Sequence, residues 1–160
     1  MSRGNTAIVV TAFLCLGWLQ IQTSAKDYNF IFDPKELECT GNVSYDNVAL
    51  TAYRARPNSE DKRDYTDLKY QTLYTLQAYL DDRAPYVTVG MDPNLKIPYG
   101  TPVCIPELNL HFRRQIKLQV RDTDDDLIGG GYRHVDICVR TQADSFDDFV
   151  NMLDATLVFL

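Results

Sequence analysis

The segments YVTVGMDPNLKIPYGTPVCIP (86–106) and IKLQVRDTDDDLIGGGYRHVDICV (116–139) decide the fold of this chain. Both contain short runs in which apolar and polar residues alternate, the pattern of half-buried β-strands. An aspartate lies inside or at the end of three such runs: Asp92, Asp122 and Asp136. The stretches between the runs are rich in Pro, Gly, Asn and Asp, the residues that form turns. The pattern predicts a small, mainly β domain.

The spacing of these patterns along the chain predicts the remaining elements. Strands are expected at 48–53, 86–92, 102–106, 116–122, 133–139 and 155–160. Helices are expected at 68–80, where the residues would also suit a strand, and at 146–153. Strict alternation places Asp122 on the apolar face of its strand and Asp136 opposite the apolar face of its strand. Many short strands, closely spaced turns and one or two short helices favour a closed or nearly closed β-barrel.

The N-terminus has the pattern of an export signal. A basic start precedes the apolar run 7–19, which is too short to span a bilayer, and small residues follow up to Ala25. We therefore expect a secretory signal peptide at 1–25, an N-terminal extension at 26–47, and the barrel domain at 48–160. The expected location of the mature protein is extracellular.

Export has consequences for cysteines and for glycosylation. Cys15 leaves with the signal, so an odd number of cysteines remains: Cys39, Cys104 and Cys138. Extracellular disulfides persist, and the positions of Cys104 and Cys138 within two predicted strands favour a bridge between these two, with pairing of Cys39 to either left open. The sequon N-V-S at Asn42 is an expected glycosylation site if the source is a eukaryote.

The charge and the motifs exclude several functions. Without Arg3, the chain has 15 basic and 22 acidic side chains, a net charge of about −7, which disfavours nucleic acid and anionic membranes. The acidic run at 122–126 lacks the glycine and the terminal glutamate of an EF-hand, and His111 and His134 lack metal-type spacing. No C-x-x-C or G-x-S-x-G motif is present. We expect no metal and no cofactor.

Three segments together resemble a known family. Leu50–Tyr53 reads L-T-A-Y, Val87–Thr101 reads V-T-V-G-M-D-P…I-P-Y-G-T, and Val120–Ile137 reads V-R-D-T…I-G-G-G…V-D-I. These segments are similar to the three-aspartate (3D) domain, a double-psi β-barrel of bacterial cell-wall proteins and of membrane-bound lytic transglycosylase A. Secreted expansin-like barrels share the architecture more loosely. Where the family has two glycines after D-T, this chain has Asp124 and Asp125.

The resemblance implies a catalytic role for Asp136. The last aspartate of the motif is the single catalytic acid/base of the lytic transglycosylase, and Asp136 matches it. Asp122 is a second candidate, because the barrel is expected to bring it near Asp136. Such an acid needs a raised pKa, from burial or from nearby negative charge. The alternative is that these carboxylates accept hydrogen bonds from backbone N–H groups, which would lower their pKa.

The remaining candidate residues would bind sugar. Tyr53, Tyr99 and Tyr132 could stack on sugar rings, and Asp92 is a further candidate for ligand binding. Packing is the alternative for each tyrosine, and a turn is the alternative for Asp92, which precedes a proline.

These observations lead to one preferred function and two alternatives. We expect a secreted, monomeric, six-stranded double-psi β-barrel that engages a polysaccharide such as peptidoglycan, chitin or another wall or matrix glycan, without turnover. One alternative is an enzyme that cleaves glycans as lytic transglycosylases do, through Asp136. The other is a non-enzymatic effector or matrix interaction protein. No membrane contact is expected after removal of the signal.

Overall fold

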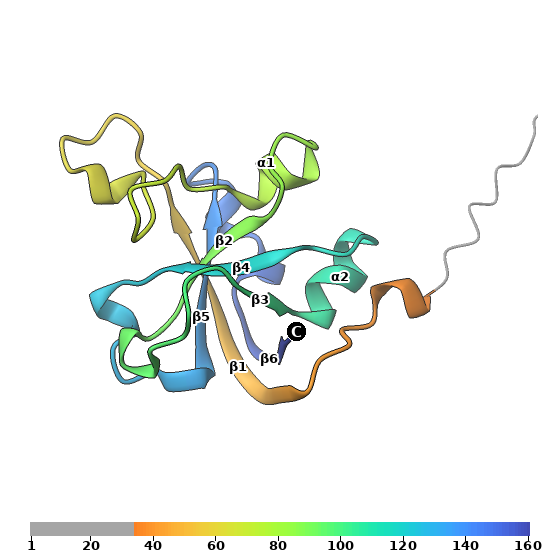
Figure 1. The fold of residues 1–160 in the computed structure, drawn as a ribbon. Coiled ribbons are helices and arrows are strands. Elements are labelled where there is room, and N and C mark those ends of the chain that lie inside the picture. Colours follow the sequence, from red (N-terminus) through yellow and green to blue (C-terminus); the bar gives the residue numbers. More distant parts are fainter. Residues whose placement is uncertain (1–33) are drawn as a thin grey trace, which may run out of the picture. The chain divides into compact units, whose positions relative to one another are not determined.

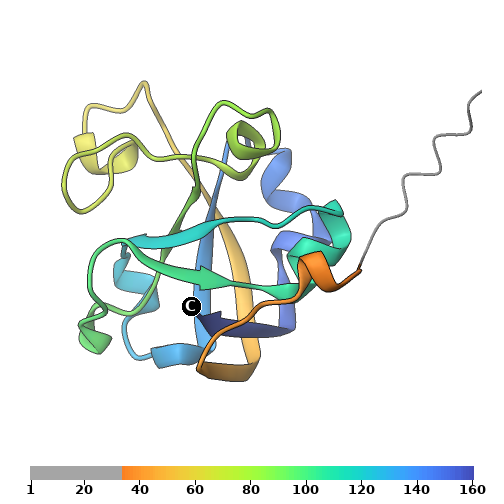
Figure 2. The same ribbon diagram turned by 45° about the vertical axis from the view of Figure 1, so that its right-hand side comes forward.

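Six strands close into a single barrel in the computed structural model, which describes residues 34–160 (Figures 1 and 2). The expected signal peptide and residues 26–33 of the expected extension lie outside the described residues. The strands are β1 (Val43–Arg54), β2 (Val87–Gly90), β3 (Thr101–Cys104), β4 (Leu118–Asp122), β5 (His134–Val139) and β6 (Met152–Phe159). Their order around the barrel is β1-β5-β2-β4-β3-β6. The predicted mainly β, six-stranded barrel is confirmed.

The barrel mixes parallel and antiparallel pairs. β1 pairs with β5, and β2 with β4, in parallel, whereas the other four neighbouring pairs are antiparallel. Parallel neighbours need crossover connections, so strands distant in the sequence become adjacent. This connectivity is compatible with a double-psi barrel. Closure also leaves no free sheet edge among these strands.

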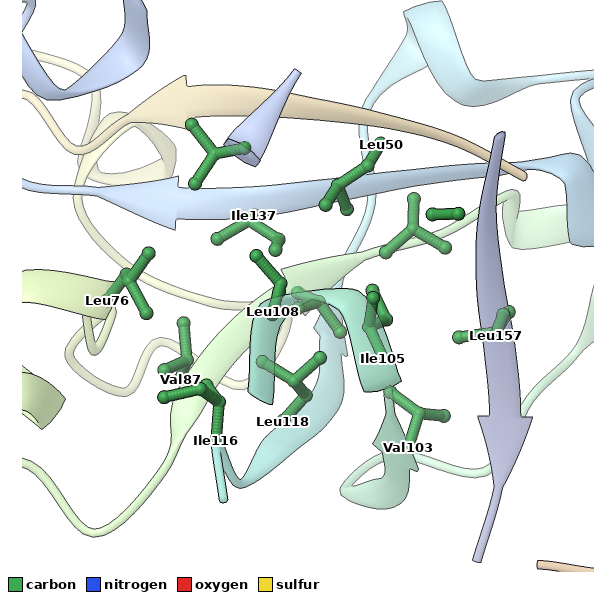
Figure 3. Close-up of a cluster of buried hydrophobic side chains, with 14 of the residues drawn as sticks. Leu50, Leu76, Val87, Val103, Ile105, Leu108, Ile116, Leu118, Ile137 and Leu157 are labelled. Atoms are coloured by element: carbon green, nitrogen blue, oxygen red, sulfur yellow. The ribbon is translucent and has the colours of Figure 1, made fainter. Parts of the chain in front are cut away.

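The interior is filled by aliphatic side chains from every strand and from both helices (Figure 3). Alternation supplies them: Val87 and Val89 of β2 are fully buried, as are Val135 and Ile137 of β5. Burying such side chains is worth about 1.5–3 kcal/mol each relative to exposure. The core therefore holds the strand register that positions the polar residues of the opposite face.

The two α-helices are α1 (Leu76–Leu80) and α2 (Pro106–Phe112). The predicted helix at 68–80 is wrong except for its last turn, because the Asp67 carboxylate accepts hydrogen bonds from the backbone N–H groups of Lys69 and Gln71 and forms a turn there. α2 lies where no helix was predicted and begins with Pro106 in its first turn, where a proline costs no hydrogen bond.

The predicted helix at 146–153 is also wrong. Two 3-10 turns, Asp144–Phe146 and Asp148–Val150, occupy the region, and β6 begins at Met152. Polar side chains interrupt the helical hydrogen bonds: the Asp147 carboxylate accepts from Phe149 N, and the Asn151 amide donates to the carbonyl of Asp147.

The disulfide joins Cys39 to Cys104, and Cys138 is a buried free thiol. The predicted bridge between Cys104 and Cys138 is wrong because β3 lies between β4 and β6 in the barrel and is not a neighbour of β5. The fully buried Asn109 of α2 supports the real bridge: its amide donates to the Leu37 carbonyl at 3.0 Å and to Cys104 Sγ at 3.2 Å. The N-terminal segment is thereby fixed against α2.

β1 begins at Val43, earlier than the predicted start at Val48. Asn42 lies directly before it and is exposed, so glycosylation there stays a prediction. Within residues 34–160, no helix has the length and apolar character needed to cross a membrane.

Candidate functional site

Three adjacent strands bring Asp136, Gly90 and Asp122 into one row. Gly90 of β2 pairs with Asp136 of β5 on one side and with Asp122 of β4 on the other. Thr51 of β1 extends the row, since it pairs with Asp136. The register of β2 and β4 shifts between Val89 and Gly90. Because of this irregularity, Asp122 does not continue the core face of β4 as strict alternation predicts.

Gly90 leaves space between the two carboxylate-bearing residues. A Cβ built on Gly90 would lie 3.6 Å from the Asp136 Cβ, 3.7 Å from the Asp122 carbonyl carbon and 3.2 Å from a methyl carbon of Leu127. Any side chain here would fill the gap between the two aspartates. The glycine therefore keeps the row open at its centre.

Asp136 is the acceptor at the end of a short hydrogen-bond chain. The Thr51 hydroxyl donates to the Asp136 carboxylate, and Thr51 Oγ1 lies 2.8 Å from His134 Nε2. A hydroxyl has one hydrogen, so His134 must donate from Nε2 for both contacts to be hydrogen bonds. Burial raises the pKa of Asp136, with the Thr51 hydrogen bond and the His134 ring acting in the opposite direction.

Asp122 is hydrogen-bonded to Tyr53. The Tyr53 hydroxyl donates to Asp122 at 2.9 Å, and the backbone N–H of Thr123 donates to its other oxygen at 3.0 Å. Burial raises the pKa of Asp122 and raises the pKa of Tyr53 well above its usual value, so Tyr53 remains a donor. The neighbouring Cys138 thiol, whose pKa burial raises to about 12, stays protonated.

The Asp92 carboxylate binds backbone N–H groups of two loops. Its carboxylate accepts from Asn94 N at 2.9 Å, Gly129 N at 2.9 Å and Gly131 N at 3.0 Å. These hydrogen bonds lower the pKa of Asp92, and the one from the backbone of Asn94 has the largest effect. The residue joins the loop after β2 to the loop after β4, which is the turn-type alternative that its sequence context allowed.

The tyrosines divide between the site and the packing. Tyr53 holds Asp122, as described. Tyr99 lies in a buried polar network: its hydroxyl donates to Asp67 at 2.5 Å and accepts from Arg121 Nη2 at 2.8 Å. Tyr132 stacks on Tyr45 with ring centroids 4.2 Å apart, so one face of its ring is in contact with another side chain.

Two hollows meet at Asp122 and Thr123. The smaller has a volume of about 190 Å³ and is lined by Tyr99 and mostly apolar side chains. The larger, about 400 Å³, is rich in carboxylates, and its lining includes the exposed Tyr70. Its aspartates are Asp61, Asp64, Asp67, Asp122, Asp124 and Asp125. Asp136 lines neither hollow.

The Thr123 hydroxyl is the one buried side-chain polar atom without a hydrogen-bond partner in the described part of the chain. It belongs to a residue shared by both hollows. Over the same residues, no group of three or more His, Cys, Asp and Glu side chains is placed to hold a metal ion. Within the acidic run 122–126, the Asp124 carboxylate accepts a hydrogen bond from the backbone N–H of Asp126.

The raised pKa of Asp136 predicts a gain in stability from Asp136→Asn. In the wild type, the folded-state pKa lies above the unfolded value of about 3.9, so stability falls as pH rises from the unfolded to the folded pKa. Asparagine is neutral and still accepts from Thr51. We expect a higher Tm than wild type at pH 7 and a smaller decline between pH 4 and pH 7, by calorimetry. A lower Tm at pH 7 would show that the ionised carboxylate stabilises the fold.

Comparison with known proteins adds no family assignment. No known family model matches the chain, and no curated protein sequence matches it significantly. The class that fold and site define is therefore a small closed mixed β-barrel with a half-buried pair of aspartates.

Proposed function

We propose that this protein is a secreted polysaccharide-binding barrel of the three-aspartate type, which holds a glycan in the two hollows that meet at Asp122. The observation that carries the proposal is the junction of the hollows: Asp122 offers an acceptor there, and the Thr123 hydroxyl has no hydrogen-bond partner among residues 34–160. Sugar hydroxyls both donate and accept hydrogen bonds, so they complement such a pair of groups.

The lining of the hollows supports a sugar ligand. Tyr70 is 70% exposed and borders the larger hollow, so its ring is free to stack on a sugar. Leu68, which is 56% exposed, borders both hollows. Apolar surface beside carboxylate acceptors suits a pyranose ring, which has apolar faces and a polar edge.

The second candidate function is glycan cleavage through Asp136. It is favoured by the raised pKa of Asp136, since a general acid must be protonated near its working pH. It is disfavoured by the position of Asp136 outside both hollows. In that mechanism Asp136 would give its proton to the glycosidic oxygen and then, as a carboxylate, take a proton from a sugar hydroxyl that closes an anhydro ring.

Retention on insoluble polymers tests the proposal. The mature protein, residues 26–160, is incubated with peptidoglycan and with chitin, and the bound fraction is measured with Asp122→Asn, Tyr70→Asn and the control Asp154→Asn. Asparagine suits position 70, where φ is +58°. We expect retention of wild type and Asp154→Asn on one polymer, and weakening of about tenfold in the other two variants, the loss of one hydrogen bond or one stacking contact.

The same incubation separates the alternatives. Soluble anhydro-sugar products that disappear with Asp136→Asn would establish the enzyme in place of the binder. Retention that is unaffected by Asp122→Asn would place the glycan elsewhere, and no retention on either polymer would contradict the proposal.

A further inference from the structure

The ends of two parallel strands form a cationic hollow in this acidic protein. The parallel strands β1 and β5 end side by side (Figure 1). Arg54 is the last residue of β1 and pairs with Val139, the last residue of β5, so Arg140 follows beside it. A hollow of about 490 Å³ lies here. It is bordered by Arg54, by Arg140 and by the loop after β1, which includes Arg56. No acidic side chain lines it.

The arginines in this hollow have free donors. Arg54 forms no ion pair and no hydrogen bond through its guanidinium within residues 34–160. Arg56 meets Asp64 through Nη2 alone, at 3.4 Å, and Arg140 meets Asp81 through Nη2 alone. A guanidinium carries five N–H donors, so these contacts orient the two side chains and leave most donors unused. The paired N–H donors of a guanidinium match the spacing of the oxygens of a carboxylate or sulfate group.

The neighbouring polar groups are consistent with an anion. The amide and hydroxyl of Thr141 both donate to the same oxygen, Oδ2, of Asp144, and Asp144 is not among the residues that line the hollow. Ser59 uses its oxygen to accept from Asp61 N, which leaves its hydroxyl hydrogen to donate. The hollow at Asp122 has the opposite charge, because six aspartates and one arginine line it.

We infer that the hollow at Arg54, Arg56 and Arg140 binds an anionic oxyacid group, a carboxylate or a sulfate, of an acidic polysaccharide. That the anion belongs to a glycan rests on the function proposed above, whereas its charge rests on this hollow alone. The two sites would then take different parts of one polymer or two different polymers: neutral sugar at Asp122 and acidic sugar at Arg54.

Titration calorimetry with three soluble probes tests this inference on the mature protein: hexagalacturonate, which carries carboxylates; a heparin-derived hexasaccharide, which carries sulfates; and neutral chitohexaose. We expect at least one anionic probe to bind, with an affinity that falls as salt rises. Arg54→Gln should weaken that binding about tenfold, the effect of one hydrogen bond to a charged group. Arg54→Lys should retain more of it, because the charge remains.

Arg133→Gln is the matched control, since it makes the same charge change at an exposed residue outside the hollow. Equal weakening by Arg54→Gln and Arg133→Gln would overturn the inference, as would no binding of either anionic probe. Binding of an anionic probe that depends on Arg54, together with no retention on peptidoglycan or chitin, would uphold this hollow and refute the site at Asp122. Unchanged polymer retention in Arg54→Gln would support two separate sites.

Discussion

Cys39→Ser is expected to lower the stability of the domain by about 4 kcal/mol. The bridge between Cys39 and Cys104 closes a loop with a sequence separation of 65 residues, and the loss of that constraint on the unfolded chain gives this magnitude in the chain-entropy account. For a domain of this size, the Tm should fall on the order of 15 °C. Thermal unfolding followed by circular dichroism measures the change.

The free cysteine provides the control. Cys138→Ala keeps the bridge, so its Tm should still drop when a reductant is added, whereas Cys39→Ser and Cys104→Ser should show no such drop. A Cys138→Ala variant that is insensitive to reductant would mean that Cys138 belongs to the disulfide, against the pairing described here.

Asp92→Ala is expected to lower stability by about 3 kcal/mol, because three backbone N–H groups lose a charged acceptor. The lowered pKa of Asp92 gives this contribution a pH dependence. The stability is fully present above the unfolded pKa of about 3.9 and is lost as pH falls through the lower folded pKa. Urea unfolding at pH 7 and at pH 3 measures both effects.

Asp154→Asn and Asp92→Asn complete this experiment. Asp154→Asn changes an exposed carboxylate and should leave the stability unchanged. Asp92→Asn keeps one oxygen acceptor and should lose less stability than Asp92→Ala. If Asp92→Ala were as stable as wild type but lost glycan retention, Asp92 would be a ligand-binding residue and not the link between two loops.

The sequence contains enough information for the barrel but not for all of its elements. Each predicted strand overlaps an observed one, because period-two alternation is a local property. α2 spans less than two turns, too short for helical periodicity to appear. The disulfide partner of Cys104 depends on which strands are neighbours, and crossover connections hide that from the local pattern.

The candidate site was predictable to a similar extent. The motif singled out Asp122 and Asp136, which the structure places on either side of Gly90. Alternation could not reveal the irregularity that moves Asp122 out of the core face. Asp67 and Arg121 were missed because their contacts with each other and with Tyr99 join residues distant in the sequence. Thr123 was part of the D-T motif, but its unpaired hydroxyl is visible only in the structure.

Amide chemical shift mapping tests the central claim, that a glycan lies in the hollows beside Asp122, most directly. Isotopically labelled mature protein is titrated with chitohexaose and with soluble peptidoglycan fragments. We predict that one of the two ligands causes its largest shifts at Tyr70, Gly90 and Thr123, and that Asp122→Asn weakens the response. Largest shifts around Arg54, or no shifts with either ligand, would contradict the claim.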